Sequence, residues 1–243
     1  MKLNFKLLLA AALLLGTGSA FKPAVKPAHI RNIDTEDRKV SDFKGISLSG
    51  SFNYYIKQGS GNAVRIEAPA KILSNIITEV KNGVLNVYTK NNTSWGSIFN
   101  NEKVAVYITA KDINSIHLSG SGDVFFKEGI KSTDLKVSLS GSGDITGTIT
   151  ATSVDCNLTG SGDIRLSGRA ENAKVKVVGS GDFTAGDLQT NNTYVEVVGS
   201  GDARVNATES LNAKVSGSGD IRYRGNPKSV SRSKTGSGDI ERG

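Results

Sequence analysis

The tetrapeptide Gly-Ser-Gly-Asp, which recurs at a nearly constant interval through the second half of the chain, is the strongest constraint on the fold. The spacings between its seven copies are 21, 19, 19, 20, 18 and 19 residues. A period of this size is typical of repeat proteins whose neighbouring units stack on one another. The copies begin at Gly120, Gly141, Gly160, Gly179, Gly199, Gly217 and Gly236.

Apolar residues stand at alternate positions on both sides of each copy. Cys156 and Leu158 precede the copy at Gly160, for example, and Ile164 follows its aspartate. This alternation has the period of a β-strand that buries one face. Glycine permits a sharp turn between such strands, and aspartate can accept hydrogen bonds from nearby backbone amides. A second, looser corner is predicted at Gly129, Gly147, Gly168, Gly186, Asn206 and Gly225.

A repeat of about 20 residues cannot bury a strand face by itself, but stacked repeats can. Residues 116–243 are therefore predicted to form a parallel β-solenoid, or β-helix, with about 19–20 residues in each coil. Cys156 falls in the column that Val137 and Val175 occupy in neighbouring repeats, so we expect it to be buried. Arg232 and Lys234 replace the two core residues in the last repeat, as expected of a charged terminal cap.

Residues 32–115 are also β-rich but lack the regular motif. Strands are predicted over 45–56, 63–68, 83–89 and 103–109, and one short helix within 69–80. The segment from Leu48 to Phe52 repeats the motif in degenerate form. Two interpretations are open: this half consists of irregular early coils, or it is a β-domain that caps the solenoid.

The first 20 residues have the pattern of a signal peptide. Lys2 and Lys6 precede an apolar run over 7–15, and small residues precede an expected cleavage after Ala20. That run is shorter than the roughly 20 residues of a membrane-spanning helix, so no transmembrane segment is predicted. Residues 21–31 are expected to be a flexible leader, and the mature protein to be periplasmic, secreted or at the cell surface.

The ordered motifs resemble the "putative auto-transporter adhesin, head GIN domain" family, which is found largely in Bacteroidetes. The resemblance covers the chain from Asp42 to its end. It implies an exported all-β protein with a right-handed, single-stranded β-helix and a role in cell adhesion, and it offers no catalytic residues to transfer. The segments that carry it are 42–46 (DFKGI), 55–59 (YIKQG), 81–85 (KNGVL) and 116–123 (IHLSGSGD).

The motif aspartates form one column if the coils stack in register. Two carboxylates one strand spacing apart repel by about 3.5 kcal/mol at an effective dielectric constant of about 20. The column must therefore be solvated, bonded to turn amides or neutralised by cations. We favour structural turns, with a Ca²⁺-binding ladder or direct contact with a ligand or partner as the alternatives, and predict no other metal or cofactor. Its members are Asp123, Asp144, Asp163, Asp182, Asp202, Asp220 and Asp239.

Trp95 and Phe99 lie in a segment rich in Asn and Ser and are candidates for contact with a partner. They could equally cover the end of the core. Other aromatic residues of the repeats, such as Phe183 and Tyr223, fall at inward positions. The sequence therefore does not favour a sugar-binding platform along the solenoid.

The composition argues against several functions. The two histidines stand alone, His29 in the leader and His117 on an outward strand face, and the uniform repeats offer no loop that could build a catalytic cleft. The net charge of +7 is spread without a long basic run, which disfavours a nucleic-acid partner. We predict an exported, non-enzymatic, adhesin-like or cell-envelope binding or structural module whose partner is a cell-surface protein or glycan. The alternatives are a polysaccharide-active β-helix enzyme and a periplasmic scaffold without its own ligand, and the oligomeric state is open.

Overall fold

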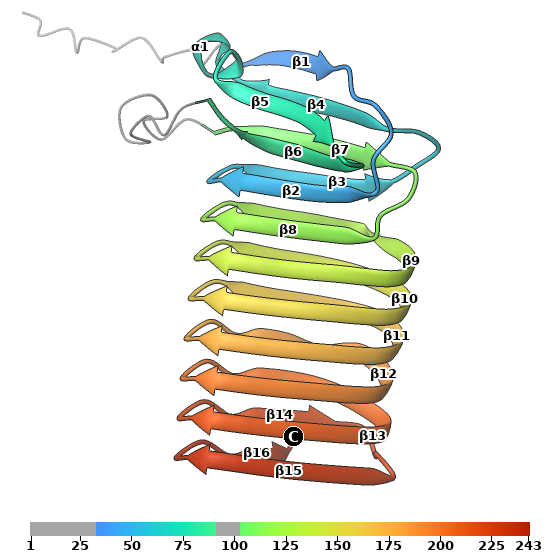
Figure 1. Cartoon of the computed structure of the whole chain (residues 1–243), viewed down its shortest axis with the longest axis vertical. Helices are drawn as coiled ribbons and strands as arrows, with labels where there is room; N and C mark the ends of the chain where they lie inside the picture. Colours follow the sequence, from blue (N-terminus) through green and yellow to red (C-terminus); the bar gives the residue numbers. More distant parts are fainter. Residues whose placement is uncertain (1–32, 91–102) are drawn as a thin grey trace, which may run out of the picture. The chain divides into compact units, whose positions relative to one another are not determined.

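Alternating apolar residues make most of the described part of the chain strand. The computed structural model describes residues 33–90 and 103–243, with 74% strand and 2% helix, and forms a parallel β-solenoid of about seven turns (Figure 1). The predicted fold class is therefore confirmed. Within the described ranges, no helix is long and apolar enough to cross a membrane.

Each repeat of the motif corresponds to one coil. A long, bent strand runs from one glycine corner to the next and pairs in parallel with the strands before and after it. In a pair without any shift in register, Asp144 lies opposite Asp163 and Gly160 opposite Gly179. Paired residues are thus separated in the chain by the spacing of the motif. These strands are β9 (Asp123–Gly141), β10 (Asp144–Gly160), β11 (Asp163–Gly179), β12 (Phe183–Gly199) and β13 (Ala203–Gly217).

The glycine corners bring successive backbones into direct contact. The first glycine of every copy has a φ between 110° and 134°, a region that side chains with a Cβ rarely adopt. The carbonyl oxygen of Gly141 accepts the N–H groups of both Ser161 and Gly162, at 3.0 and 3.1 Å. A Cβ on Gly160 would overlap that same oxygen. The motif thus needs glycine for its conformation and also for the close approach of the coils.

Inward side chains fill the solenoid in columns. Cys156 lies between Val137 and Val175 and is 1% exposed, as predicted. Gly147 differs from the prediction, because it is a buried inward position opposite Phe126 and not a corner. A Cβ on Gly147 would overlap the ring of Phe126, so the missing side chain makes room for the large one in the previous coil.

The degenerate motif in the first half is a true corner. Gly50 has a φ of 120° and lies opposite Gly120, and Asn53 takes the aspartate position opposite Asp123. The strand predicted over 45–56 is therefore divided at Ser51. Its two parts, β2 (Gly45–Gly50) and β3 (Asn53–Gln58), form one coil.

The order of the coils departs from the order of the chain. Strands β6 (Val84–Thr89) and β7 (Ala105–Ala110) pair with one edge of the β2–β3 coil, and β8 (Ser115–Gly120) and β9 with the other. In Figure 1 the blue β2–β3 coil accordingly lies between β6 and β7 on one side and β8 on the other. The chain passes over its own first coil after β7 before the regular repeats begin.

A partly antiparallel layer closes this end. Strands β1 (Asp34–Arg38) and β4 (Ala63–Ala68) continue the sheet beyond β7, and β5 (Ile76–Lys81) pairs with β6. The helix predicted within 69–80 is a single turn, α1 (Ala70–Leu73). Residues 76–81 form β5 instead because Asn82 and Gly83, with φ of 51° and 74°, make a tight hairpin turn into β6. This half thus combines one early coil with a cap.

The other end carries charge at its core positions. Strands β14 (Ile221–Arg224), β15 (Ser229–Gly236) and β16 (Ile240–Arg242) form the last turns. Arg232 lies opposite Ala213 and Lys234 opposite Val215, as predicted. The Arg232 guanidinium stacks on the Tyr223 ring with its carbon 5.2 Å from the centroid, and Lys234 binds the Asp239 carboxylate at 2.6 Å. Charge therefore covers the end of the apolar column.

The close approach at the corners predicts unequal effects of glycine-to-alanine changes. Gly160→Ala should lower the free energy of unfolding by about 2 kcal/mol, because the new Cβ forces both an unfavourable φ and a backbone overlap. Gly186→Ala is the matched control, since a Cβ there meets only the Arg224 side chain, at 3.6 Å or more. Urea unfolding of both variants measures the difference, and equal losses would contradict the account.

The charged end predicts a change in association. In Arg232→Val/Lys234→Val, the apolar column reaches the open end of the sheet, so copies should stack end to end. Light scattering after gel filtration should give a higher mass for this variant than for the original chain. Lys136→Val/Lys174→Val, which removes the same charge from outward positions, should leave the mass unchanged. An unchanged mass in the first variant would refute the capping role.

Candidate functional site

In-register coils convert each outward position into a column of side chains along the solenoid. Three outward features carry chemistry: the aspartate column, a polar groove at the bend of the long strands, and a groove beside a stack of aromatic rings. The sequence predicted the first of them. The other two emerge from the packing of the coils.

The aspartate column is a chain of hydrogen bonds between coils. Oδ1 of Asp144 accepts the backbone N–H of Asp163 at 3.1 Å, and Oδ1 of Asp163 accepts that of Asp182 at 3.0 Å. The same bond, at 2.9 Å, continues through Asp202 and Asp220 to Asp239. The carboxylates thus bond to amides, but each amide belongs to the next coil and not to the residue's own turn.

Neighbouring cations offset part of the charge of this column. Arg165 contacts both Asp144 and Asp163, at 3.4 and 2.5 Å. The hydrogen bond from Lys234 holds the pKa of Asp239 below its usual value. Asp123 shows the opposite effect, because burial and the adjacent Asp144 charge raise its pKa. Within residues 33–90 and 103–243, no group of three or more His, Cys, Asp or Glu side chains is arranged to hold a metal ion.

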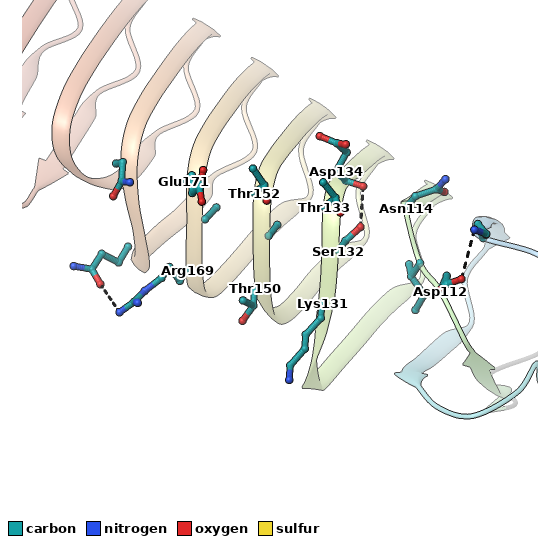
Figure 2. Close-up of a pocket in the computed structure, with 16 residues that line it drawn as sticks. Asp112, Asn114, Lys131, Ser132, Thr133, Asp134, Thr150, Thr152, Arg169 and Glu171 are labelled. Carbon is teal, nitrogen blue, oxygen red and sulfur yellow. Dashed lines mark hydrogen bonds and ion pairs between the residues drawn. The ribbon is translucent and has the colours of Figure 1, made fainter.

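The polar groove has a volume of about 1160 Å³ and crosses several coils at the bend. Figure 2 shows Lys131, Thr150 and Arg169 on successive coils, and their backbones pair in register. Arg169 donates a hydrogen bond to Gln189 at 3.3 Å, in the next coil. The groove lining includes three cations and three anions, Lys44, Lys131, Arg169, Asp112, Asp134 and Glu171. It therefore offers donors and acceptors to a long partner at a regular interval, one coil apart.

Three aromatic rings stack in a second outward column. Tyr107 of β7, Tyr55 of β3 and Phe125 of β9 lie on neighbouring strands, with ring centroids 5.1 and 5.4 Å apart and planes inclined by 17° and 22°. Both tyrosines are 38% exposed. The same column continues through Arg65 and Asp37 in one direction and through Thr146, Arg165 and Thr184 in the other.

A groove of about 740 Å³, here called the aromatic groove, runs beside this stack. The hydroxyl of Tyr107 donates to Glu67 at 3.2 Å, and Arg65 Nε donates to Asp37 at 2.8 Å. Burial and the Glu67 carboxylate raise the pKa of Tyr107. Lys127 Nζ lies 5.6 Å from the centroid of the Phe125 ring. The remaining residues that line the aromatic groove are Ile56, Lys57, Ala63, Ile108, Thr109 and Glu128.

The sequence prediction missed the aromatic stack, because its expectation of inward aromatic residues concerned the repeats, and Tyr55 and Tyr107 lie before them. One signal was available, because Tyr55 and Phe125 each stand two residues after the aspartate position of a motif copy. Tyr107 gave no such signal. It lies 52 residues from Tyr55 in the chain and reaches it only because the coil order departs from the chain order.

The other predicted residues are placed as follows. Trp95 and Phe99 lie outside the described residues. His117 is on the outward face between Ile116 and Leu118, as expected, and partial desolvation together with the Lys136 charge lowers its pKa. Burial raises the pKa of the Cys156 thiol, which keeps it protonated in the core.

Comparisons with known proteins agree with this architecture. The model of the family described as "Putative auto-transporter adhesin, head GIN domain" matches residues 42–227. A structure of a "putative adhesin" from Bacteroides fragilis has a TM-score of 0.83 and 31% identity, over 87% of this chain and 97% of that one. A "putative lipid binding protein" from Parabacteroides distasonis has a TM-score of 0.71 and 26% identity, over 87% and 97%. No curated protein matches the chain.

The bonding in the aspartate column predicts how substitutions will act. Asp182→Ala should lower the free energy of unfolding by about 1 kcal/mol, because the Asp202 amide loses its acceptor. Asp182→Asn keeps an acceptor oxygen, so its stability should stay within about 0.5 kcal/mol of the original value. Urea unfolding measures both changes.

The same pair of variants tests the cation alternative. If the column holds Ca²⁺, millimolar Ca²⁺ should stabilise the original chain, and both variants should lose that gain. The hydrogen-bond account predicts no gain from Ca²⁺. It is contradicted if Asp182→Asn loses as much stability as Asp182→Ala.

Proposed function

The chain belongs to the family described as "Putative auto-transporter adhesin, head GIN domain", and from this premise we propose that it is an exported, non-enzymatic, adhesin-like binding module. Its partner is a protein or glycan at the cell surface, held on an outward face of the solenoid. The observation that carries this proposal is the polar groove, where donors and acceptors stand in register on successive coils.

The repetition suits recognition of an extended partner. Neighbouring strands are about 4.8 Å apart, so each coil offers a new set of contacts at a fixed interval along the groove. Single contacts with exposed polar groups are weak, and several of them in register give a usable affinity. Lys131, Thr150, Arg169 and Gln189 provide such a series.

The same uniformity argues against the enzyme alternative. Hydrolysis or elimination on a polysaccharide needs an acid and a base in distinct environments. The aspartates from Asp144 to Asp220 instead share one hydrogen-bond arrangement, because the Oδ1 of each accepts the backbone amide of the aspartate in the next coil. His117 has a lowered pKa but lies opposite Ser47 and Ser138, not beside a carboxylate partner in its own column.

We propose export through a signal peptide over residues 1–20, which gives a mature chain that begins with the leader at Phe21. Burial of the single cysteine, Cys156, is compatible with an oxidising compartment because the thiol is inaccessible. Trp95 and Phe99 remain candidates for additional contact with the partner. A scaffold without a ligand would not need the polar groove.

Binding of the mature chain, residues 21–243, to an array of glycans and matrix proteins tests the proposal. A set of lipid vesicles is added to the array because one structurally similar protein is described as a putative lipid binding protein. We expect saturable and selective binding, and about tenfold weaker binding for Lys131→Glu/Arg169→Glu, which reverses charge inside the polar groove. Lys136→Glu/Lys174→Glu makes the same charge change outside it and should bind normally.

Two outcomes would count against the proposal. Absence of binding to every class of probe would favour the scaffold alternative. Equal binding by both charge variants would mean that the polar groove is not the contact surface. Repeating the array with a calcium chelator shows whether any binding depends on Ca²⁺.

A further inference from the structure

We propose that the aromatic groove is a separate binding site for a neutral oligosaccharide. The inference deepens the proposed function, and it rests on that function in treating the chain as a binding module. It concerns a different surface from the polar groove, at the junction between the parallel coils and the antiparallel layer of β1 and β4.

The aromatic stack is not required for the coils to pair. In the coils that follow, the same column holds Thr146, Arg165 and Thr184, and these strands pair in the same parallel register. Tyr107, Tyr55 and Phe125 therefore add something besides strand pairing, although aromatic pairs also stabilise a sheet. What they add is exposed apolar surface along one wall of a groove.

The charges around the groove point to a neutral ligand. The lining contains three cations, Arg65, Lys57 and Lys127, and three anions, Asp37, Glu67 and Glu128, so the formal charges sum to zero. A site for a phosphate or an acidic sugar would carry an excess of cations. Mixed donors and acceptors beside an apolar wall instead suit a molecule with hydroxyl groups on its rim and C–H groups on its faces.

Several of these polar groups are held in place before any ligand binds. Arg65 is fixed by Asp37, and Glu67 by the hydroxyl of Tyr107. Among the described residues, Lys57 and Glu128 form no side-chain hydrogen bond or ion pair. They are therefore available to a ligand, while Arg65 and Glu67 are already oriented by their partners.

The size of the groove favours a small ligand over a protein. Its volume of about 740 Å³ lies within the roughly 300–1,000 Å³ of small-molecule sites. A stable protein interface needs about 800 Å² from each partner, far more than one groove of this kind offers. A sugar oligomer of a few units fits both the dimensions and the chemistry.

Titration of the mature chain with neutral sugar hexamers tests the inference. The probes are cellohexaose, maltohexaose, mannohexaose and xylohexaose, and calorimetry or NMR reports binding. We expect at least one hexamer to bind, and Tyr55→Thr/Tyr107→Thr to weaken it about tenfold or more. Threonine is chosen because Thr146 and Thr184 fill the same column in intact coils, so the variant should fold.

The matched control is Tyr194→Thr, which removes a tyrosine from an outward position beside Lys214, away from the groove. It should leave hexamer affinity unchanged. A polyanionic hexamer, hexagalacturonate, should bind more weakly than the preferred neutral one. Urea unfolding of each variant confirms that the coils are intact.

The possible results distinguish a failure of the oligosaccharide site from a failure of the proposed function. If no neutral hexamer binds, or if Tyr55→Thr/Tyr107→Thr keeps full affinity, the inference is wrong. Adhesion on the array that depends on Lys131 and Arg169 would then still support the proposed function. If hexamers bind through the tyrosines but the array shows no surface partner, the oligosaccharide site stands and the adhesion proposal fails.

Discussion

The structure depends on the contact between backbones at the glycine corners. There the carbonyl oxygen of one glycine accepts two N–H groups from the next coil, and the chain leaves no space for a Cβ. Because both the conformation and the approach require glycine, the corner can form in only one register. Gly50 shows the rule outside the regular repeats, since it keeps the φ and the pairing of the other corners in a degenerate motif.

Once the corners fix the register, the side chains at each remaining position of the repeat line up in a column along the solenoid. Inward columns hold the apolar core, and a large residue such as Phe126 is accommodated by a glycine in the next coil, Gly147. The inward columns end in charge at Arg232 and Lys234. Outward columns repeat whatever chemistry the sequence supplies. The aspartates use this repetition for stability by bonding to the next coil, and the two grooves present it to solvent.

The sequence was informative wherever its signal was periodic. The motif spacing predicted the solenoid, the burial of Cys156, the outward position of His117 and the charged end. It could not predict that the β2–β3 coil lies between β6–β7 and β8–β9, because no local pattern records which strands become neighbours. For the same reason it missed strands β1 and β5 and the stack of Tyr107, Tyr55 and Phe125. The sequence predicted that the aspartates accept hydrogen bonds from backbone amides. It did not predict that each of these amides belongs to the next coil.

Amide hydrogen exchange at the corners tests the central claim most directly. The account predicts strong protection of the Ser161 and Gly162 amides, although Ser161 is at the surface, because both donate to the carbonyl oxygen of Gly141. Gly61, in an exposed turn, provides the unprotected reference. If Ser161 and Gly162 exchange as fast as Gly61, the corners do not hold the coils in register.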